Sequence, residues 1–274
     1  MRTLKFIFDF YLDASIHVAL AVVALTCATC YLLNIPWDFL LLGFIFFSTI
    51  VCYNFIKYGV EAHKYIIVSN TYHKSIQLFS FLSFGAAVCC LVNLDKQVWM
   101  ATALLGLLST FYAVPLLPHA KNLRSLAGFK VYVVALVWTG FTVLLPVLSE
   151  SLKLEWDVWL LMFQRFVLVL ILMLPFEIRD LQWDDKHLKT LPQVLGIRQT
   201  KRLGLLLVLL FFVLTFLKDE IHQSEIIMRL VLGVVLVLAL FLHRNEKSKY
   251  FASFWVEGIP IVWLGLFWLE LKVF

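Results

Sequence analysis

Long apolar stretches, each of about 20 residues, recur along the whole chain and are separated by short polar segments. A stretch of this length is sufficient for an α-helix to cross the hydrocarbon core of a bilayer. Its continuous apolarity differs from the alternating pattern of half-buried strands. The pattern predicts nine spanning helices, at 14–33, 38–56, 76–94, 98–117, 128–148, 158–180, 203–217, 226–242 and 251–271. We therefore expect an all-α, polytopic membrane protein, with one transmembrane domain over residues 1–274.

The composition agrees with this fold class. Hydrophobic residues make up 62% of the chain and charged residues 15%, whereas a soluble domain is about half apolar with roughly a quarter of its residues charged. The longest polar connection, 181–202, is too short for a separate soluble domain. The net charge of +5 reflects Lys and Arg in the loops of a membrane protein and does not indicate nucleic-acid binding.

The distribution of basic residues predicts an orientation. With the N-terminus inside, 17 of the 23 Lys and Arg residues fall on the inner side of the predicted spans. Loops rich in Lys and Arg remain in the cytoplasm of membrane proteins. We therefore expect an integral protein of the plasma (inner) membrane, with a cytoplasmic N-terminus. The loops that follow the second, fourth, sixth and eighth helices are expected on the same side.

Three carboxylates follow the sixth predicted span. Glu177, Asp180 and Asp184 are spaced at i, i+3 and i+7, so a continuing helix places them on one face. Like charges one turn apart repel each other, which favours a functional reason for keeping them. Magnesium binds to one or two carboxylates together with the oxygens of a bound phosphate. The spacing therefore predicts a magnesium–phosphate site at the end of a membrane helix, and a substrate with an anionic head and an apolar tail.

Basic residues in two loops are candidate phosphate ligands. Arg179 and Lys189 accompany the three carboxylates, while Lys121, Arg124 and Lys130 follow the fourth predicted span. Carboxylates that hold a metal beside cations that bind phosphate are the two parts of a diphosphate site. The alternative is that these are ordinary cytoplasmic loops whose charges are solvated.

The end of the second predicted span carries another polar face. Asn54, Lys57, Tyr58 and Glu61 are spaced at i, i+3, i+4 and i+7 and share one side of a helix. An amide, an ammonium, a phenol and a carboxylate are all able to bind a diphosphate or its metal, with Lys57 as a point charge. This face has fewer carboxylates than the one after the sixth span.

Two charged residues, Arg165 and Glu257, lie several residues inside predicted spans. Ionisable groups at that depth are costly and usually face a cavity or a partner. A long side chain such as Arg165 can also extend toward the membrane surface.

The sequence resembles the UbiA superfamily of intramembrane prenyltransferases. The segment from Glu177 to Asp184 resembles the second motif of the family, D-x-x-D-x-x-x-D, which a basic-Thr-Leu-Pro stretch follows. Nine helices with cytoplasmic active loops also match the family over nearly the whole chain. The matching positions are Glu177, Asp180, Asp184, Lys189, Thr190, Leu191, Pro192 and Gly196, and more weakly Tyr112, Pro115 and Lys121.

The resemblance implies an enzyme that binds a polyprenyl diphosphate through two magnesium-holding motifs, on the second and sixth helices. It implies transfer of the prenyl group to an aromatic or other lipophilic acceptor, in a central cavity that opens sideways to lipid. The implied catalytic residues are Glu177, Asp180 and Asp184, and the implied metal ligands are Glu177, Asp180, Asp184 and Glu61. The implied diphosphate ligands are Asn54, Lys57, Tyr58, Lys121, Arg124, Arg179 and Lys189.

The first motif departs from the family pattern N-D-x-x-D-x-x-x-D. Asn54 matches, but Phe55, Tyr58 and Ala62 stand at the aspartate positions, and Glu61 is one residue early. Two alternatives therefore remain beside prenyl transfer. One is a non-catalytic homologue that binds isoprenoid diphosphate or quinone. The other is an enzyme that cyclises or hydrolyses the isoprenoid diphosphate.

Overall fold

The computed structural model describes residues 2–59, 71–113, 128–184, 188–219, 221, 223–242 and 250–273, and within this part of the chain it is all-α, with no β-strand. In chain order the elements are α1 (Arg2–Asp13), α2 (Ile16–Leu32), α3 (Phe39–Asn54), η1 (Phe55–Gly59), α5 (Thr71–Val92), α6 (Lys96–Ala113), α7 (Lys130–Thr139), η3 (Gly140–Leu144), α8 (Leu145–Ser149), α9 (Trp156–Asp180), α10 (Leu191–Leu195), α11 (Ile197–Val213), η5 (Leu214–Leu217), α12 (Gln223–Leu242), η6 (Phe251–Val256) and α13 (Ile259–Val273). Three of the short segments, η1, η3 and η6, are π-helical.

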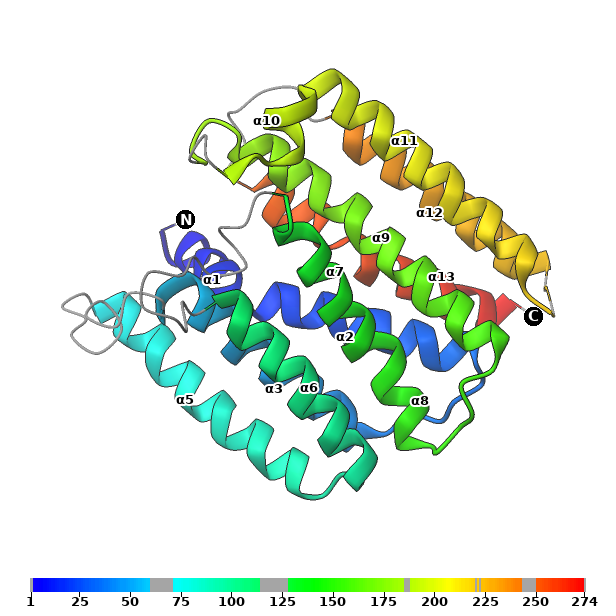
Figure 1. Cartoon of the computed structure of the whole chain (residues 1–274). Helices are drawn as coiled ribbons and strands as arrows, with labels where there is room; N and C mark the ends of the chain where they lie inside the picture. The colour runs from blue at the N-terminus through cyan, green and yellow to red at the C-terminus, as the bar shows by residue number, and fades with distance from the viewer. Residues whose placement is uncertain are drawn as a thin grey trace.

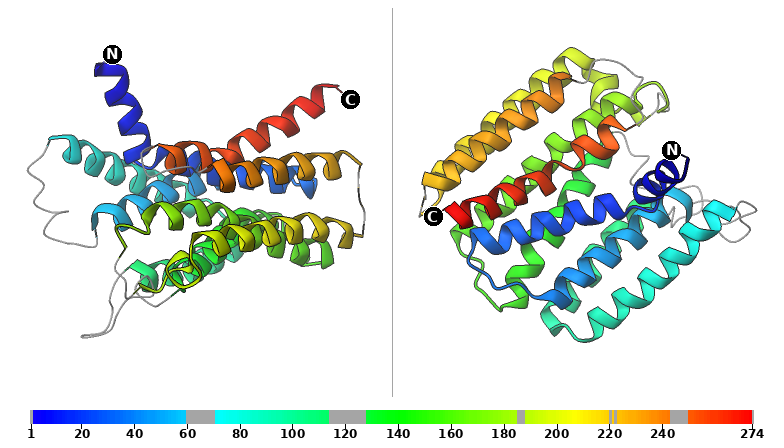
Figure 2. Two further views of the ribbon diagram at one scale, coloured as in Figure 1. Left: turned by 90° about the horizontal axis from the view of Figure 1, so that it is seen from above. Right: turned by 180° about the vertical axis from the view of Figure 1, so that it is seen from behind.

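The long helices form one bundle around α2 and α9 (Figure 1). On one side α2 packs against α3, and α3 packs along α5. On the other side α9 packs against α7 and α11, and α11 packs along α12. The last helix, α13, closes the bundle against α2 and α12, and α1 projects from the bundle near the start of α2 (Figure 2).

The predicted spans agree with the observed helices. Each of the nine predicted segments overlaps a helix or a run of consecutive helical elements. Within the described residues, seven helices are long and apolar enough to cross a membrane, and the bent pair α1–α2 makes an eighth candidate. The protein is therefore a polytopic membrane protein, while the predicted number of nine spans stays a prediction.

The hydrophobic pattern did not predict α1. This helix alternates charged residues with exposed apolar ones such as Phe6 and Ile7, so it lacks the long apolar run of a span. A bend of 55° separates it from α2. The bend lies at Ser15, whose φ of 62° is left-handed, a conformation that is uncommon for a residue other than glycine.

The central position of α9 explains its polar residues. In its spanning segment, 72% of the residues are buried, so side chains such as that of Arg165 face other helices and not lipid. The Arg165 guanidinium donates hydrogen bonds to the Leu25 carbonyl oxygen (2.8 Å) and to Oγ1 of Thr29 (3.0 Å), and it lies over the Trp263 ring. Arg165 therefore joins α9 to α2 and lines neither of the two cavities described below.

A second buried charge cluster joins η5 to α12. Both oxygens of Glu225 are engaged, one by the Lys218 ammonium at 2.8 Å and the other by the Arg229 guanidinium at 2.5 Å. All three side chains are at most 7% exposed. Charges removed from water need close partners of opposite sign. Glu225 is the counter-ion that both buried cations share.

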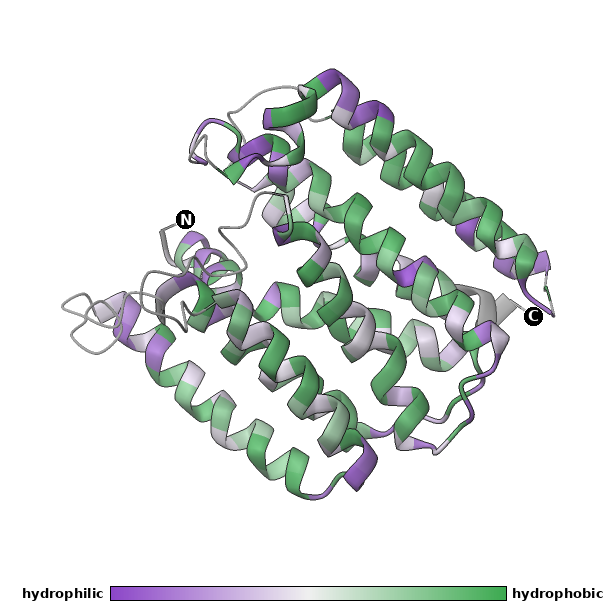
Figure 3. Cartoon of the chain, viewed as in Figure 1, coloured by the Kyte–Doolittle hydropathy of each residue, from purple (hydrophilic) through white to green (hydrophobic). Residues whose placement is uncertain are grey.

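Hydrophilic residues lie at both ends of the bundle (Figure 3), and the candidate site lies at one of them. This end, which we call the polar end, is formed by the C-terminal ends of α3 and α9 and the N-terminal ends of α5, α7 and α11 (Figure 1). It contains all the candidate site residues that the structure describes.

Candidate functional site

Two of the three predicted carboxylates meet at the polar end, and they meet around a lysine. The Lys130 ammonium lies 3.1 Å from Oε1 of Glu177 and 3.9 Å from Oδ2 of Asp184. The Glu177 side chain is only 2% exposed. Neither of these two carboxylate oxygens has a hydrogen bond of good geometry to a described residue. The arrangement therefore leaves two buried anionic oxygens that point toward one cation.

Local backbone structure brings these groups together. α9 ends at Asp180, earlier than the continuing helix that the spacing predicted, but the Asp184 amide still donates to the Asp180 carbonyl oxygen at 2.8 Å. This extra turn carries Asp184 round to the side of Glu177. The Gly128 amide donates to the Leu188 carbonyl oxygen at 3.2 Å and fixes the start of α7 beside this turn. Lys130, the first residue of α7, therefore extends toward the two acids.

The third carboxylate, Asp180, is paired differently. Its two oxygens accept hydrogen bonds from Nε (2.7 Å) and Nη2 (3.2 Å) of the neighbouring Arg179. Both side chains are about one third exposed. Asp180 also lines the central cavity, so this ion pair lies between the cavity and the solvent side of the polar end.

The carboxylates partly fit the magnesium ion that the sequence implies. Among the described residues, no group of three His, Cys, Asp or Glu side chains is arranged to hold a metal, because Asp180 faces Arg179. Glu177 and Asp184 nevertheless direct two oxygens without hydrogen-bond partners at one cation. Two carboxylates are sufficient for magnesium when substrate phosphates complete the shell. The fourth predicted ligand, Glu61, lies outside the described residues.

The predicted residues of the second span occupy the bend between α1 and α2. Asn54 is fully buried; its amide donates to the Ala14 carbonyl oxygen and to Ser80, and its oxygen accepts from the Ser15 hydroxyl. The Lys57 ammonium donates to the Leu12 carbonyl oxygen at 3.3 Å and to the Ser15 hydroxyl at 2.9 Å.

Tyr58 acts on the same bend, where its hydroxyl donates to the Asp13 carbonyl oxygen at 3.3 Å. Lys57 and Tyr58 thus satisfy carbonyl groups at the C-terminal end of α1, where helices leave acceptors unpaired. In this structure the predicted diphosphate ligands Asn54, Lys57 and Tyr58 hold α1 in place.

The remaining predicted ligands lie apart from the acids or outside the described part of the chain. Lys121 and Arg124 are not among the described residues. Lys189 is exposed, with a left-handed φ of 45°, directly before the capping box that Thr190 and Gln193 form at the start of α10. The cation that reaches the acids is Lys130, which belongs to the same predicted cluster as Lys121 and Arg124.

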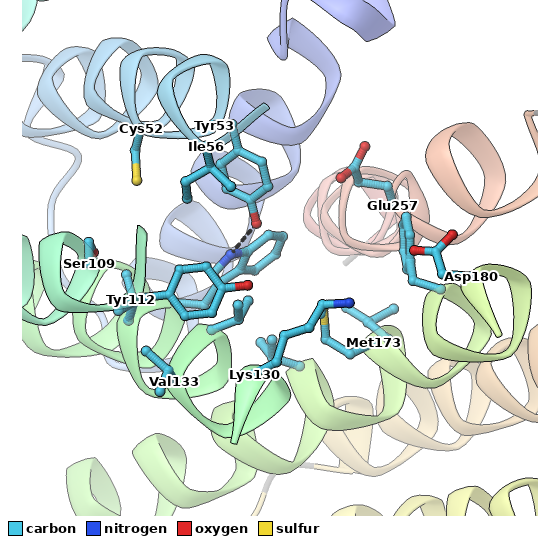
Figure 4. A pocket seen from close by; sticks show the side chains of 16 residues that line it. Cys52, Tyr53, Ile56, Ser109, Tyr112, Lys130, Val133, Met173, Asp180 and Glu257 are labelled. Carbon is cyan, nitrogen blue, oxygen red and sulfur yellow. Dashed lines mark hydrogen bonds between the residues drawn. The ribbon is translucent and has the colours of Figure 1, made fainter. Parts of the chain in front are cut away.

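A cavity of about 190 Å³ lies beneath these charges (Figure 4). Its walls come from α3, η1, α6, α7 and α9, with Glu257 between η6 and α13. Three charged residues, Lys130, Asp180 and Glu257, line it together with the aromatic rings of Tyr53, Tyr112, Trp138 and Phe176. The Trp138 indole donates a hydrogen bond of 2.8 Å to the Tyr53 hydroxyl oxygen.

A larger, more apolar cavity of about 430 Å³ adjoins the first. The two share six lining residues, among them Tyr53 and Trp138, and therefore lie side by side. The second cavity lies between α5, which packs against α3, and α6, which packs against α7 and α8. Its lining residues Phe84 and Val88 are also 56% and 42% exposed on the outer surface. A cavity with charged residues at the polar end thus adjoins an apolar cavity that opens sideways between helices.

Comparisons with known proteins support this arrangement at the level of the fold. No protein-family model matches the sequence, and no curated protein sequence matches it. The structure is similar to that of a UbiA homolog from Archaeoglobus fulgidus bound to GPP and Mg2+. The match covers 95% of this chain and 98% of the homolog, with a TM-score of 0.60 and 11% sequence identity. A digeranylgeranylglyceryl phosphate synthase is similar over 98% of this chain and 97% of its own, with a TM-score of 0.56 and 14% identity. The chain therefore has the fold of UbiA-type membrane prenyltransferases.

Proposed function

We propose that this protein transfers a prenyl group from a polyprenyl diphosphate to an aromatic or other lipophilic acceptor. The observation that carries the proposal is that a cavity with charged residues at the polar end adjoins an apolar cavity that opens between helices. A prenyl diphosphate has the same division, because its head is anionic and its tail is a hydrocarbon. The similar fold of the Archaeoglobus fulgidus homolog, which was solved with GPP and Mg2+, supports this substrate class.

The diphosphate would lie among the charges at the end of α9. Among the described residues, Lys130 and Arg179 are the cations that pair with the three carboxylates. A bound diphosphate would draw both cations toward its oxygens, because charge-assisted hydrogen bonds to phosphate are strong. Lys189 lies at the polar end, and Lys121 and Arg124 follow α6 in the sequence; all three are proposed as further diphosphate ligands.

Magnesium is the proposed cofactor, with Glu177 and Asp184 as its main ligands and Asp180 and Glu61 as further ones. When bound, magnesium neutralises the negative charge that accumulates on the departing diphosphate. Once Lys130 has turned to the phosphates, the oxygens of Glu177 and Asp184 are free for a metal. The carboxylates of this face would then bind the metal, and the cations would bind the phosphates.

The cavity provides the surroundings for the allylic cation. When the bond between C1 and the diphosphate oxygen breaks, positive charge develops on the prenyl carbon. The rings of Tyr112, Trp138 and Phe176 line the cavity, and aromatic faces attract a cation within about 6 Å. The apolar walls also exclude water, which favours capture of the cation by a bound acceptor over hydrolysis.

A second candidate function is binding of an isoprenoid diphosphate or quinone without transfer. It is favoured by one observation, the engagement of Asn54, Lys57 and Tyr58 in contacts with α1. Those contacts engage the described polar residues of the second span in the fold, so among the described residues the carboxylates after α9 are the candidate metal ligands.

The test is an assay of the purified protein in lipid nanodiscs. Radiolabelled geranyl and longer prenyl diphosphates are supplied with magnesium and a mixture of aromatic acceptors. The proposal predicts release of diphosphate together with a prenylated product. Saturable binding without release of diphosphate would support the second candidate instead. Release of diphosphate with only a prenyl alcohol or a cyclic hydrocarbon would indicate a hydrolase or a cyclase.

Replacing Lys130 by methionine is expected to weaken binding of the prenyl diphosphate by about 10- to 100-fold, since a hydrogen bond to a charged group contributes about 1.5–3 kcal/mol. Methionine keeps the length and apolar stem of the side chain but removes the ammonium. Binding is measured with a radiolabelled, non-ionisable prenyl thiolodiphosphate. The exposed Lys74 supplies the control Lys74→Met, and equal affinities for the two variants would contradict a phosphate-binding role for Lys130.

A further inference from the structure

Glu257 is a carboxylate that lines the central cavity and has no role in the proposed diphosphate site. It lies at the junction of η6 and α13 and lines the same cavity as Tyr53 (Figure 4) and Trp138. No described residue forms a hydrogen bond or an ion pair with its side chain. Lys57 and Arg179 act on it electrostatically, but Lys57 is bound to the end of α1 and Arg179 to Asp180.

The backbone holds Glu257 firmly in this position. The next residue, Gly258, has no room for a side chain, because a Cβ atom would lie 2.7 Å from the Phe254 carbonyl oxygen and 3.2 Å from Nε2 of His17. His17 is itself fixed, since its Nε2 donates to that carbonyl oxygen at 2.9 Å and its Nδ1 accepts from the Tyr11 hydroxyl at 2.7 Å. The start of α13 follows Gly258 directly, and helix N-termini favour a nearby negative charge.

An unpaired carboxylate in a largely apolar cavity is costly unless a ligand uses it. Glu257 shares the cavity with Lys130 and Asp180 at the polar end, where we place the diphosphate. It also shares the cavity with the Tyr53 hydroxyl, whose oxygen already accepts from Trp138. The Tyr53 proton is therefore available to a ligand. Together a carboxylate and a phenol provide one hydrogen-bond acceptor and one donor for a hydroxylated molecule.

We propose that Glu257 receives the proton of the prenyl acceptor, and that the acceptor is an uncharged phenol or hydroquinone rather than an aromatic acid. This inference rests on the proposed prenyl transfer. An uncharged hydroxyl group can donate its proton to Glu257, whereas a carboxylate on the acceptor would be repelled by it. Glu257 is thus assigned two roles, proton acceptor and discriminator of acceptor charge.

Prenyl transfer begins at the ester bond of the prenyl diphosphate. The bond between C1 of the prenyl group and the diphosphate oxygen breaks, and its electron pair leaves with the diphosphate. The ring carbon next to the phenol oxygen forms a bond to C1 while the phenol proton passes to Glu257. The hydrogen of that carbon then passes as a proton to the departed diphosphate, and Glu257 returns its proton to the ring oxygen. Overall one ring hydrogen is exchanged for the prenyl group, and diphosphate and one proton are released.

The test compares two acceptors of equal ring size, 4-hydroxybenzyl alcohol and 4-hydroxybenzoate, with radiolabelled geranyl diphosphate and magnesium in nanodiscs. The wild-type protein is expected to prenylate the uncharged alcohol at least about tenfold more efficiently, since a like charge across a short distance is unfavourable even at a moderate dielectric constant. In Glu257→Gln, transfer to the alcohol is expected to fall by about 100-fold or more, and the preference against the acid is expected to shrink. Glu150→Gln, at an exposed position far along the chain, is the matched control.

A second readout separates this inference from the proposed function. Glu257→Gln should still release diphosphate and form geraniol by capture of water, because the diphosphate site is intact. Unchanged transfer and charge preference in Glu257→Gln would overturn the inference but leave prenyl transfer standing. Ionisation by the wild-type protein without prenylation of either phenol would also overturn it. Absence of diphosphate release from the wild-type protein would instead remove the proposed function itself.

Discussion

The double variant Glu177→Gln, Asp184→Asn is expected to release diphosphate from a prenyl diphosphate at least about 100-fold more slowly than the wild-type protein. Both substitutions keep the shape of the side chain and remove its charge. They delete the only two carboxylates that meet at one point among the described residues at the polar end. Diphosphate release is measured with a radiolabelled substrate under single-turnover conditions with saturating magnesium.

The control for this prediction is Glu150→Gln, which removes one exposed carboxylate at the opposite end of α8 from the site. Asp180→Asn alone should have a smaller effect than the double variant, because Asp180 is paired with Arg179. A double variant that retains wild-type rates would exclude Glu177 and Asp184 from metal binding.

Glu225→Gln is expected to lower the free energy of unfolding by about 3–5 kcal/mol, because it leaves buried cations without their counter-ion. Lys218 and Arg229 both contact Glu225, and the cluster is almost fully enclosed. Two nitrogens of Arg229 already lack partners among the described residues, so the guanidinium depends on this carboxylate. Chemical unfolding in mixed micelles, followed by tryptophan fluorescence, measures the change.

Glu155→Gln is the matched control, since Glu155 is exposed at the start of α9 and its side chain makes no capping hydrogen bond. Adding Arg229→Met to Glu225→Gln should restore part of the lost stability, because it removes one of the two uncompensated charges. If Glu225→Gln and Glu155→Gln unfold alike, the cluster is not a source of stability.

The spans and the acid face were predictable from sequence because each depends on a local pattern. Runs of apolar residues fixed the helices, and the spacing from Glu177 to Asp184 placed two acids together even though α9 ends at Asp180. α1 was missed since its charged residues interrupt the apolar run. Its short amphipathic pattern resembles an ordinary polar segment.

The partners of the site residues were not predictable, because they come from distant parts of the chain. Lys130 was one of several candidate cations, and the contact between Gly128 and Leu188, which lie far apart in the sequence, holds it beside the acids. Lys57 shares its predicted polar face with Asn54, yet it binds the end of α1, an element absent from the prediction. The depth of Glu257 inside a predicted span could be read from the sequence. The cavity that it lines could not, because five other elements form its walls.

Binding of geranyl thiolodiphosphate, with and without magnesium, tests the central claim most directly. This compound retains the anionic head and apolar tail but ionises far more slowly than the natural ester. The account predicts saturable binding that tightens as magnesium is added, and loss of the magnesium effect in Glu177→Gln, Asp184→Asn. Binding that is independent of magnesium, or equal in the wild-type protein and the double variant, would contradict a magnesium–diphosphate site at the end of α9.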